Sequence, residues 1–284
     1  MTTNVKQLHT TDTAALQRMA RKNITWRDLR HFTTWDTIKE LLLPLPFAVA
    51  AFAFAQLGET VHWGFLPLSL LACFLFFLAG LRLSHDAFHH NLGLSRRGDD
   101  LVLVATSVAM MISNHVVKFS HLNHHKHCMT EDDVEADSAR MPWWQALLYG
   151  PMFPVKLHIH AWRKGGPTVR RFMLIELALS VVLVTLAFGL FNWFALKFFI
   201  GAMLVGECLT AFFAVWTVHH DTEDDPAVAR TQRGFWKNGL TLNMFHHAEH
   251  HLFPGVPTRK LPDLAARIDA FTPELTRRRV LPEL

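Results

Sequence analysis

Three clusters of histidine hold most of the residues in this sequence that could do chemistry. They read HDAFHH at residues 85–90, HLNHHKH at residues 121–127 and HHAEHH at residues 246–251, and they contain eleven of the 19 histidines. Neutral imidazole is the commonest nitrogen ligand for zinc, copper, iron and nickel. Three such clusters, in a chain with little other polar surface in its middle, predict one metal site assembled from distant segments.

The spacing inside each cluster places imidazoles on shared helix faces. Residues i and i+4 lie on one face of a helix, so a pair such as the first and fifth residues of HDAFHH can bind one ion. In the pattern H-x-x-H-H of the other two clusters, the adjacent pair can address two neighbouring ions. The candidate ligands are His85, His89, His121, His124, His125, His247, His250 and His251. One ion cannot use eight imidazoles, so the spacing predicts a binuclear centre.

Long apolar segments must position these clusters. Half of the residues are hydrophobic and only 18% are charged, below the roughly 25% of an ordinary soluble domain. Four apolar runs, at residues 41–57, 63–83, 172–191 and 193–218, are close to the roughly 20 residues that a helix needs to cross a bilayer. The connections at residues 56–64 and 189–193 are short, so the four helices are predicted to form two hairpins.

Two shorter apolar stretches, at residues 101–116 and 143–155, contain polar residues or prolines. Runs of this length are more often interfacial or re-entrant than spanning. If either crossed the bilayer, the clusters would face opposite sides and one site could not form. Lys and Arg flank the outer ends of both hairpins and are absent from their short tips. By the positive-inside rule, both termini and all three clusters are expected in the cytoplasm.

The rest of the sequence bears on domain organisation, on nucleic-acid binding and on the role of the cysteines. Residues 1–37 are polar and mixed in charge and are expected to form a cytosolic segment without a signal peptide, while residues 38–284 are expected to form a single membrane-embedded domain. The formal charge of +4 is mild and no nucleic-acid-binding motif is present, so no nucleic-acid partner is expected. Cys73, Cys128 and Cys208 are scattered and odd in number, which predicts neither a disulfide framework nor a thiolate metal site.

The three histidine clusters, in this order along the chain, resemble those of the membrane fatty acid desaturase and hydroxylase superfamily. The acidic second residue of the first cluster resembles both acyl-lipid desaturases and carotenoid ketolases. Asn243 before the third cluster, and the tail His-His-Leu-Phe-Pro that begins at His250, are typical of desaturases. The acidic run TEDDVEAD at residues 130–137 also matches an acidic segment of the family. The resemblance covers about residues 63–257.

The resemblance implies an all-α membrane protein with four transmembrane helices in two hairpins, interfacial helices and a cytosolic histidine-rich cap. It implies a non-haem di-iron centre with dioxygen as co-substrate, and a ninth histidine ligand at the cytosolic end of the fourth helix. His219 is the choice for that ligand and His220 is its rival. Residues expected around the ligands, where they could orient imidazoles or a bound water, are Asp86, Asn243, Glu249, His90 and His246.

The predicted function is oxygen-dependent desaturation of a fatty acyl lipid. The alternative is a hydroxylase or ketolase acting on a carotenoid or another lipid, because the same clusters serve both. No flavin, nicotinamide or iron–sulfur motif is visible, so a ferredoxin, flavodoxin or cytochrome with its reductase is expected to deliver electrons at the bacterial inner membrane. A histidine-rich metal transporter would carry ionisable residues deep in several helices, whereas only Glu207 lies deep here.

Overall fold

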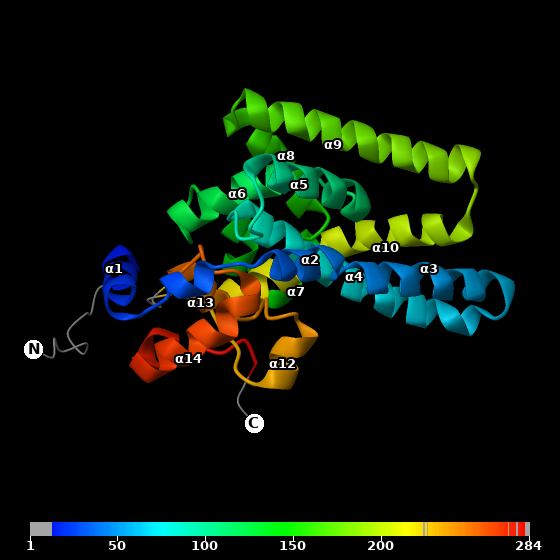
Figure 1. Cartoon of the computed structure of the whole chain (residues 1–284). Helices are drawn as coiled ribbons and strands as arrows, with labels where there is room; N and C mark the ends of the chain where they lie inside the picture. The colour runs from blue at the N-terminus through cyan, green and yellow to red at the C-terminus, as the bar shows by residue number, and fades with distance from the viewer. Residues whose placement is uncertain (1–12, 224, 226, 272, 277, 282–284) are drawn as a thin grey trace, which may run out of the picture. The chain divides into compact units, whose positions relative to one another are not determined.

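The computed structural model describes residues 13–281 except 224, 226, 272 and 277, and it is built from helices (Figure 1). Among these residues, the only β-type pairing is an isolated bridge between Thr231 and Arg279. Two compact units are formed. The membrane unit is His31–Trp216, and the terminal unit combines Met1–Arg30 with Thr217–Leu284. The predicted all-α fold is confirmed, whereas the predicted domain boundary at residue 37 stays a prediction.

The membrane unit contains nine α-helices and short 3-10 or π segments within its described residues. In chain order they are α2 (Thr34–Leu42), α3 (Leu45–Thr60), the 3-10 turn Trp63–Phe65, α4 (Leu66–Phe88), α5 (Arg96–Met110), α6 (Asn114–His127), the 3-10 segment Glu135–Arg140, α7 (Trp143–Tyr149), α8 (Met152–Lys164), α9 (Pro167–Thr185), the π segment Leu186–Leu190, α10 (Phe194–Thr210) and the π segment Ala211–Trp216. Prolines open several of them at the first turn, where a missing N–H costs nothing.

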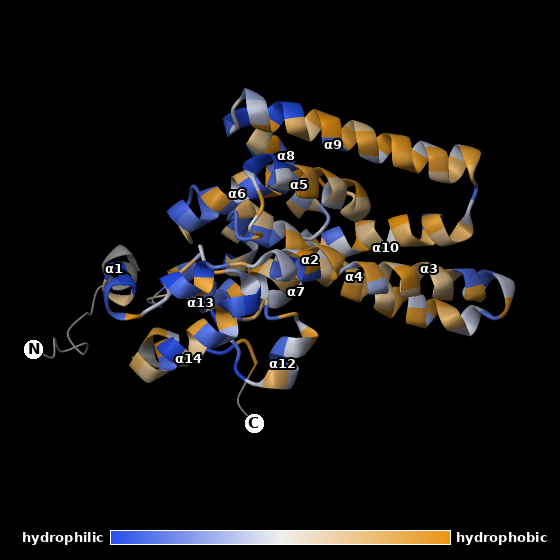
Figure 2. Cartoon of the chain, viewed as in Figure 1, coloured by the Kyte–Doolittle hydropathy of each residue, from blue (hydrophilic) through white to orange (hydrophobic). Residues whose placement is uncertain are grey.

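Four helical stretches of the described chain are long and apolar enough to cross a membrane. They are Thr34–Thr60, Trp63–Phe88, Pro167–Leu190 and Phe194–His219. In Figure 2, α3, α4, α9 and α10 are mostly hydrophobic along their length. Leu70 and Leu71 on α4, and Val181 and Val182 on α9, are each more than half exposed. Apolar side chains exposed in such number suit contact with lipid rather than with water, so the predicted four spanning helices are confirmed.

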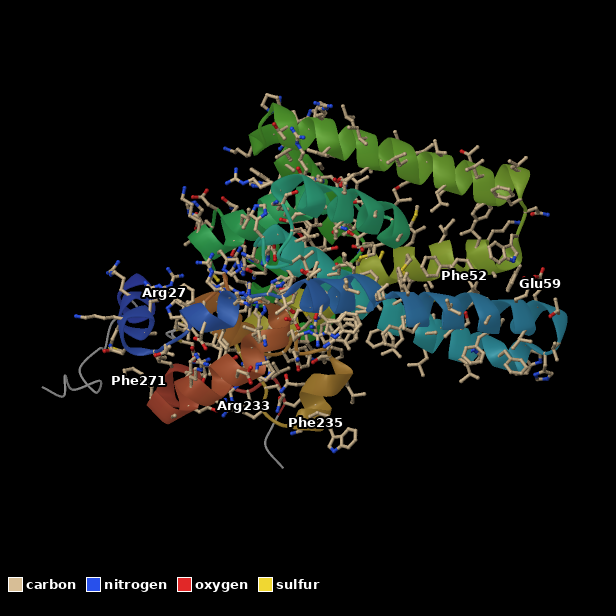
Figure 3. All side chains as sticks on the ribbon, viewed as in Figure 1. Arg27, Phe52, Glu59, Arg233, Phe235 and Phe271 are labelled. Carbon is tan, nitrogen blue, oxygen red and sulfur yellow. The ribbon has the colours of Figure 1, made fainter. Side chains whose placement is uncertain are left out.

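The first hairpin is closed by close packing of α3 against α4, which lie side by side in Figure 1. The Ser69 hydroxyl donates to the carbonyl of Ala51 over 2.8 Å. This hydrogen bond satisfies a buried hydroxyl group that has no access to water. Figure 3 shows Glu59 near the turn and Phe52 further along α3. The Phe52 ring stacks on Phe199 of α10 at 5.0 Å between centroids. The two hairpins of the membrane unit therefore pack on each other through aromatic side chains.

The stretch between the hairpins, which was predicted to be interfacial or re-entrant, is sharply bent. Helices α5 and α6 meet at 111° across a short break. Met111 ends α5 in the left-handed conformation with φ of 64°, and Ser113 begins α6 as its N-cap by accepting a hydrogen bond from the N–H of Val116. The Asn114 N–H donates to the Ser107 hydroxyl over 2.8 Å. Together these polar groups satisfy the backbone where the helix breaks.

A carboxylate from the third span holds this break in place. Glu176 on α9 is fully buried. It accepts a hydrogen bond from the hydroxyl of Ser113, and its Oε1 lies 2.6 Å from Nδ1 of His115. The His115 ring also stacks on Phe172, with 3.8 Å between centroids. His115 thus anchors α9 on the α5–α6 break.

The terminal unit is a small helical body with its own apolar core. Its elements are α1 (Thr13–Asn23), the 3-10 turn Arg27–Arg30, α11 (Thr217–His219), α12 (Phe235–Leu240), α13 (His247–Leu252), the 3-10 turn Thr258–Lys260, α14 (Leu261–Phe271) and the 3-10 turn Pro273–Thr276. Leu252 and Phe253 pack with Leu264 and Ile268 of α14 in a buried cluster. The core therefore clamps the end of α13, which carries the third histidine cluster.

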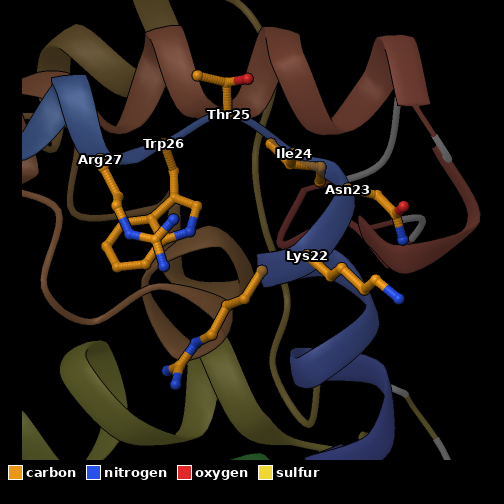
Figure 4. A pocket seen from close by; sticks show the side chains of 7 residues that line it. Lys22, Asn23, Ile24, Thr25, Trp26 and Arg27 are labelled. Carbon is orange, nitrogen blue, oxygen red and sulfur yellow. The ribbon is translucent and has the colours of Figure 1, made fainter.

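The amino-terminal part of the terminal unit is fastened to α14 by an ion pair. Both guanidinium nitrogens of Arg267 lie 2.7 Å from the carboxylate of Asp28, and the Trp26 ring packs against Phe253 at 5.5 Å between centroids. A hollow of about 180 Å³ opens between residues 21 and 27, and Figure 4 shows the side chains that line it. None of those residues is a predicted metal ligand.

Candidate metal centre

The end of α4 is locked from two sides, and this fixes the first histidine cluster. Arg82 forms a buried ion pair with Glu40 of α2, with 2.6 Å between Nη2 and Oε1. The Ser84 hydroxyl donates to the Thr106 hydroxyl of α5 over 2.9 Å. His85 lies in the last turn of α4 and His89 caps it. Their rings are 5.2 Å apart between centroids, so the predicted i, i+4 face is present.

The second cluster lies on α6 and meets the first. Ring centroids of His121 are 4.9 Å from His85 and 5.1 Å from His89, and His125 is 4.8 Å from His89. Ligand atoms of His85, His89 and His121 all lie within 4.8 Å of one another. Nε2 of His125 is 3.1 Å from Nε2 of His121. Two nitrogens bound to one metal at about 2.1 Å lie about 3 Å apart at bond angles near 90°, so this spacing suits shared ligation.

Burial keeps two of these imidazoles in the form that binds metal. His89 and His125 are removed from water by the surrounding helices, and this desolvation lowers the pKa of each ring well below its usual value, with the neighbouring histidine His121 adding to the effect. A neutral ring presents a lone pair, whereas a protonated ring does not. The membrane unit therefore contains a ready set of nitrogen donors.

Carboxylates from the acidic run orient the rings of the second cluster. Nδ1 of His121 lies 2.9 Å from Glu135, and Nδ1 of His124 lies 2.7 Å from Asp133. Burial disfavours the charged form of Asp133, but its hydrogen bond with His124 and two backbone N–H donors hold the pKa of that carboxyl below its usual value. A carboxylate on Nδ1 leaves Nε2 to face a metal. Neither of these two orienting roles was predicted from the sequence, although the acidic run itself was the signal.

The terminal unit gathers the third cluster with His219. Nε2 of His247 lies 2.9 Å from Nε2 of His219 and 3.2 Å from Nε2 of His251. The Nδ1–H of His219 donates to the carbonyl of Val228 over 2.8 Å, which directs Nε2 toward the other rings. His250 is buried on the same short helix. His220 is only half-buried and belongs to no group of metal-ligating residues in the described chain. The structure thus places His219, and not His220, beside the cluster.

Contacts between Glu249 of α13 and the segment that precedes α12 hold the third cluster in its conformation. Glu249 is fully buried; the Thr231 hydroxyl donates to its Oε2 over 2.6 Å, and Arg233 lies 2.7 Å from its Oε1. Arg233 also pairs with Asp269 of α14, and these carboxylates raise the pKa of its guanidinium above the usual value against the opposing effect of burial. The carboxylate of Glu249 therefore fixes α13 to the surrounding chain.

The other residues expected around the ligands take varied places. His90 is half exposed and its Nδ1 lies 2.6 Å from Asp99 of α5. His246 is buried, with Nδ1 at 3.8 Å from Glu249. Asn243 adopts φ of 68° and its carbonyl accepts from the N–H of His246. Asp86 is buried in the last turn of α4. Roles in orienting a metal-bound ring or water stay predictions for all five expected residues, as does metal binding by the nine histidines.

The donor set fits a late first-row metal such as iron. Every predicted ligand is an imidazole, two of the rings in the membrane unit are held neutral by burial, and carboxylates hold Nδ1 of two others. Imidazole suits iron, zinc, copper and nickel, whereas oxygen-rich sites suit magnesium and calcium. Each unit supplies nitrogen atoms at spacings of about 3 Å, which is what ligands of one ion require.

Comparison with known proteins agrees with this site. The family model described as "Fatty acid desaturase" matches residues 61–281. The chain therefore belongs to the fatty acid desaturase family, which with its four apolar spans makes it a multi-pass membrane protein and points to an oxidoreductase. A β-carotene ketolase of Paracoccus sp. (strain N81106 / MBIC 01143) is 28% identical over 215 residues, covering 72% of this chain and 79% of the relative. A second β-carotene ketolase, of Paracoccus sp. (strain PC1), is 26% identical over 253 residues, covering 81% of this chain and 93% of the relative.

Proposed function

We propose that this protein uses dioxygen and two iron ions to oxidise C–H bonds of a carotenoid-like lipid, as a ketolase or hydroxylase. The observation that carries the proposal is the grouping of imidazoles, some held neutral by burial and others oriented by carboxylates, in a member of the fatty acid desaturase family. The two β-carotene ketolases that resemble the chain over most of its length support the choice of substrate class. An apolar substrate also suits a protein whose outer surface is built for lipid.

Iron is the proposed metal because the reaction needs a redox-active ion. An unactivated C–H bond does not yield to acid–base groups, and the bound iron pair would supply the oxidising chemistry. His85, His89, His121, His124, His125, His219, His247, His250 and His251 are the residues proposed to hold the two ions. The chain's own contribution is to position these rings, to keep His89 and His125 neutral by burial and to exclude water around them. Asp133 and Glu135 hold Nδ1 protons so that Nε2 donates to the metal.

Desaturation of a fatty acyl chain is the second candidate. It is favoured by the description of the matching family and by the His-His-Leu-Phe-Pro sequence that ends the third cluster. Both reactions remove hydrogen from a C–H bond, and they differ in whether oxygen is transferred to carbon.

An external electron donor is part of the proposal. A ferredoxin, flavodoxin or cytochrome with its reductase would supply two electrons per turnover. In the membrane unit, Arg163, Lys164 and Arg171 are exposed at the ends of α8 and α9, where they could receive an acidic partner. The Arg230–Lys237 segment is a weaker candidate, because Arg230 and Arg233 are already engaged within the terminal unit. Anchoring to lipid headgroups would use the same exposed cations.

The test is product analysis in two bacterial hosts, one that makes β-carotene and one that makes no carotenoid. Gain of one oxygen with loss of two hydrogens identifies a ketone, and gain of one oxygen alone identifies a hydroxyl group. Loss of two hydrogens from membrane fatty acids identifies desaturation. A chain with His250→Ala, expressed to the same level, is the negative control. If β-carotene stays unchanged while fatty acids gain double bonds, the ketolase proposal is wrong and the second candidate replaces it.

A further inference from the structure

The carboxyl-terminal end of α6 carries a sulfur donor beside a predicted metal ligand. His124, Cys128 and Asp133 form a group whose ligand atoms all lie within 4.8 Å of one another. Cys128 follows the last residue of α6 as its C-cap, four residues after His124, so both side chains lie on one face of the helix. His124 is buried and Cys128 is half-buried. The scattered positions of the three cysteines predicted no thiolate metal site.

The geometry at His124 directs its metal-binding nitrogen toward this sulfur. Nδ1 of His124 faces Asp133 at 2.7 Å, so Nε2 is the atom that would bind a metal. Sγ of Cys128 lies 3.8 Å from that Nε2. A metal about 2.1 Å from nitrogen and about 2.3 Å from sulfur separates the two donors by about 3.1 to 3.8 Å at bond angles from about 90° to 120°. The observed distance falls at the upper end of that range.

We propose that Cys128 binds, as a thiolate, the same iron ion that His124 binds. The inference rests on the proposed function and adds a ligand that the histidine clusters do not contain. On binding, the thiol proton is released to water and a sulfur lone pair forms the iron–sulfur bond, while the iron keeps its oxidation state. Asp133 is not the third ligand, because its two oxygens are occupied by the His124 ring and by the backbone N–H groups of Met129 and Ala136.

A thiolate would make the two irons unequal. Sulfur is a softer donor than imidazole and pushes electron density onto its metal. The iron that binds His124 and Cys128 would therefore be harder to reduce than an iron with nitrogen ligands only. The two irons would then have different reduction potentials. A redox titration would show their reduction as two separate transitions.

The other two cysteines serve as internal references. Cys73 is buried in an apolar cluster on α4. Cys208 is half-buried on α10. Neither belongs to a group of metal-ligating residues in the described chain. A sulfur signal from the metal should therefore depend on Cys128 alone.

The experiment measures iron content and iron X-ray absorption of the purified full chain and of the variants Cys128→Ser and Cys208→Ser. Wild type and Cys208→Ser are expected to show a sulfur scatterer at about 2.3 Å from iron, at one sulfur for two irons, beside nitrogen at about 2.1 Å. Cys128→Ser should lose the sulfur scatterer. Wild type with two irons and no sulfur, or sulfur that persists in Cys128→Ser, overturns the thiolate and leaves the di-iron proposal standing. Wild type that binds no iron overturns the proposed function itself.

Alkylation of the wild-type chain tests the same inference without a substitution. Cys128 should resist a small thiol reagent while iron is bound and should react after the iron is removed with a chelator, as read by peptide mass spectrometry. Cys208 should react to the same extent in both states. Equal labelling of Cys128 before and after chelation would show that iron does not bind its sulfur.

Discussion

Replacing Asp133 by Asn should lower the affinity of the protein for iron without removing any metal ligand. The carboxylate of Asp133 is fully buried and receives three hydrogen bonds, from Nδ1 of His124 at 2.7 Å and from the N–H groups of Met129 and Ala136 at 3.0 and 3.2 Å. The amide of Asn has the same shape but no charge and only one acceptor oxygen. The change therefore isolates what the carboxylate does for the ring.

The size of the effect follows from these contacts. If the Asn oxygen takes the place of Oδ2, the bonds to His124 and Met129 persist and the N–H of Ala136 faces an NH₂ group. Loss of that one bond costs about 1 to 3 kcal/mol of folding stability. The ring of His124 keeps its orientation but loses a charged partner. Loss of such partners costs about 10- to 100-fold in metal affinity, which is about 1.4 to 2.7 kcal/mol.

The assay is iron retention during dialysis against increasing concentrations of chelator, with thermal unfolding followed on the same samples. We expect Asp133→Asn to release its iron at a chelator concentration about 10- to 100-fold lower than wild type requires. Asp132→Asn is the matched control, because Asp132 is the exposed neighbour. If Asp133→Asn unfolds earlier yet retains iron like wild type, the carboxylate only shapes the loop, and the assignment of Nε2 of His124 to the metal loses its support.

Two further predictions concern the fourth span and the topology. His219→Ala should lose iron and activity together, because Nε2 of His219 belongs to the histidine group of the terminal unit, whereas His220→Ala should keep most of its iron; the reverse result in parallel metal analyses would contradict the assignment. A cysteine at Glu59, exposed near the turn of the first hairpin, should react with a membrane-impermeant thiol reagent added to intact cells. A cysteine at exposed Glu131 should react only after lysis, and labelling from outside would place the second histidine cluster on the wrong side for a cytoplasmic site.

The sequence determined the spans because their signal is local. A helix that crosses a bilayer needs an unbroken apolar run of roughly 20 residues, and such runs can be read without knowing any contact. The shortness of the apolar run at residues 101–116 likewise predicted an interfacial or re-entrant segment, and the structure shows a bend of 111° there. The choice of ligand faces also followed from local spacing, since four residues bring imidazoles to one side of a helix.

Tertiary structure alone decided which groups support those ligands. Glu176 reaches His115 across 61 positions in the chain, and Arg82 reaches Glu40 across 42. Glu135 and Cys128 were visible in the sequence, but their orientation toward His121 and His124 depends on how the chain turns after α6. Periodicity fixes the direction of a side chain only within one helix. Partners that meet across a turn or between helices are selected by packing and by the need to satisfy buried polar groups, and neither condition is visible until the chain is folded.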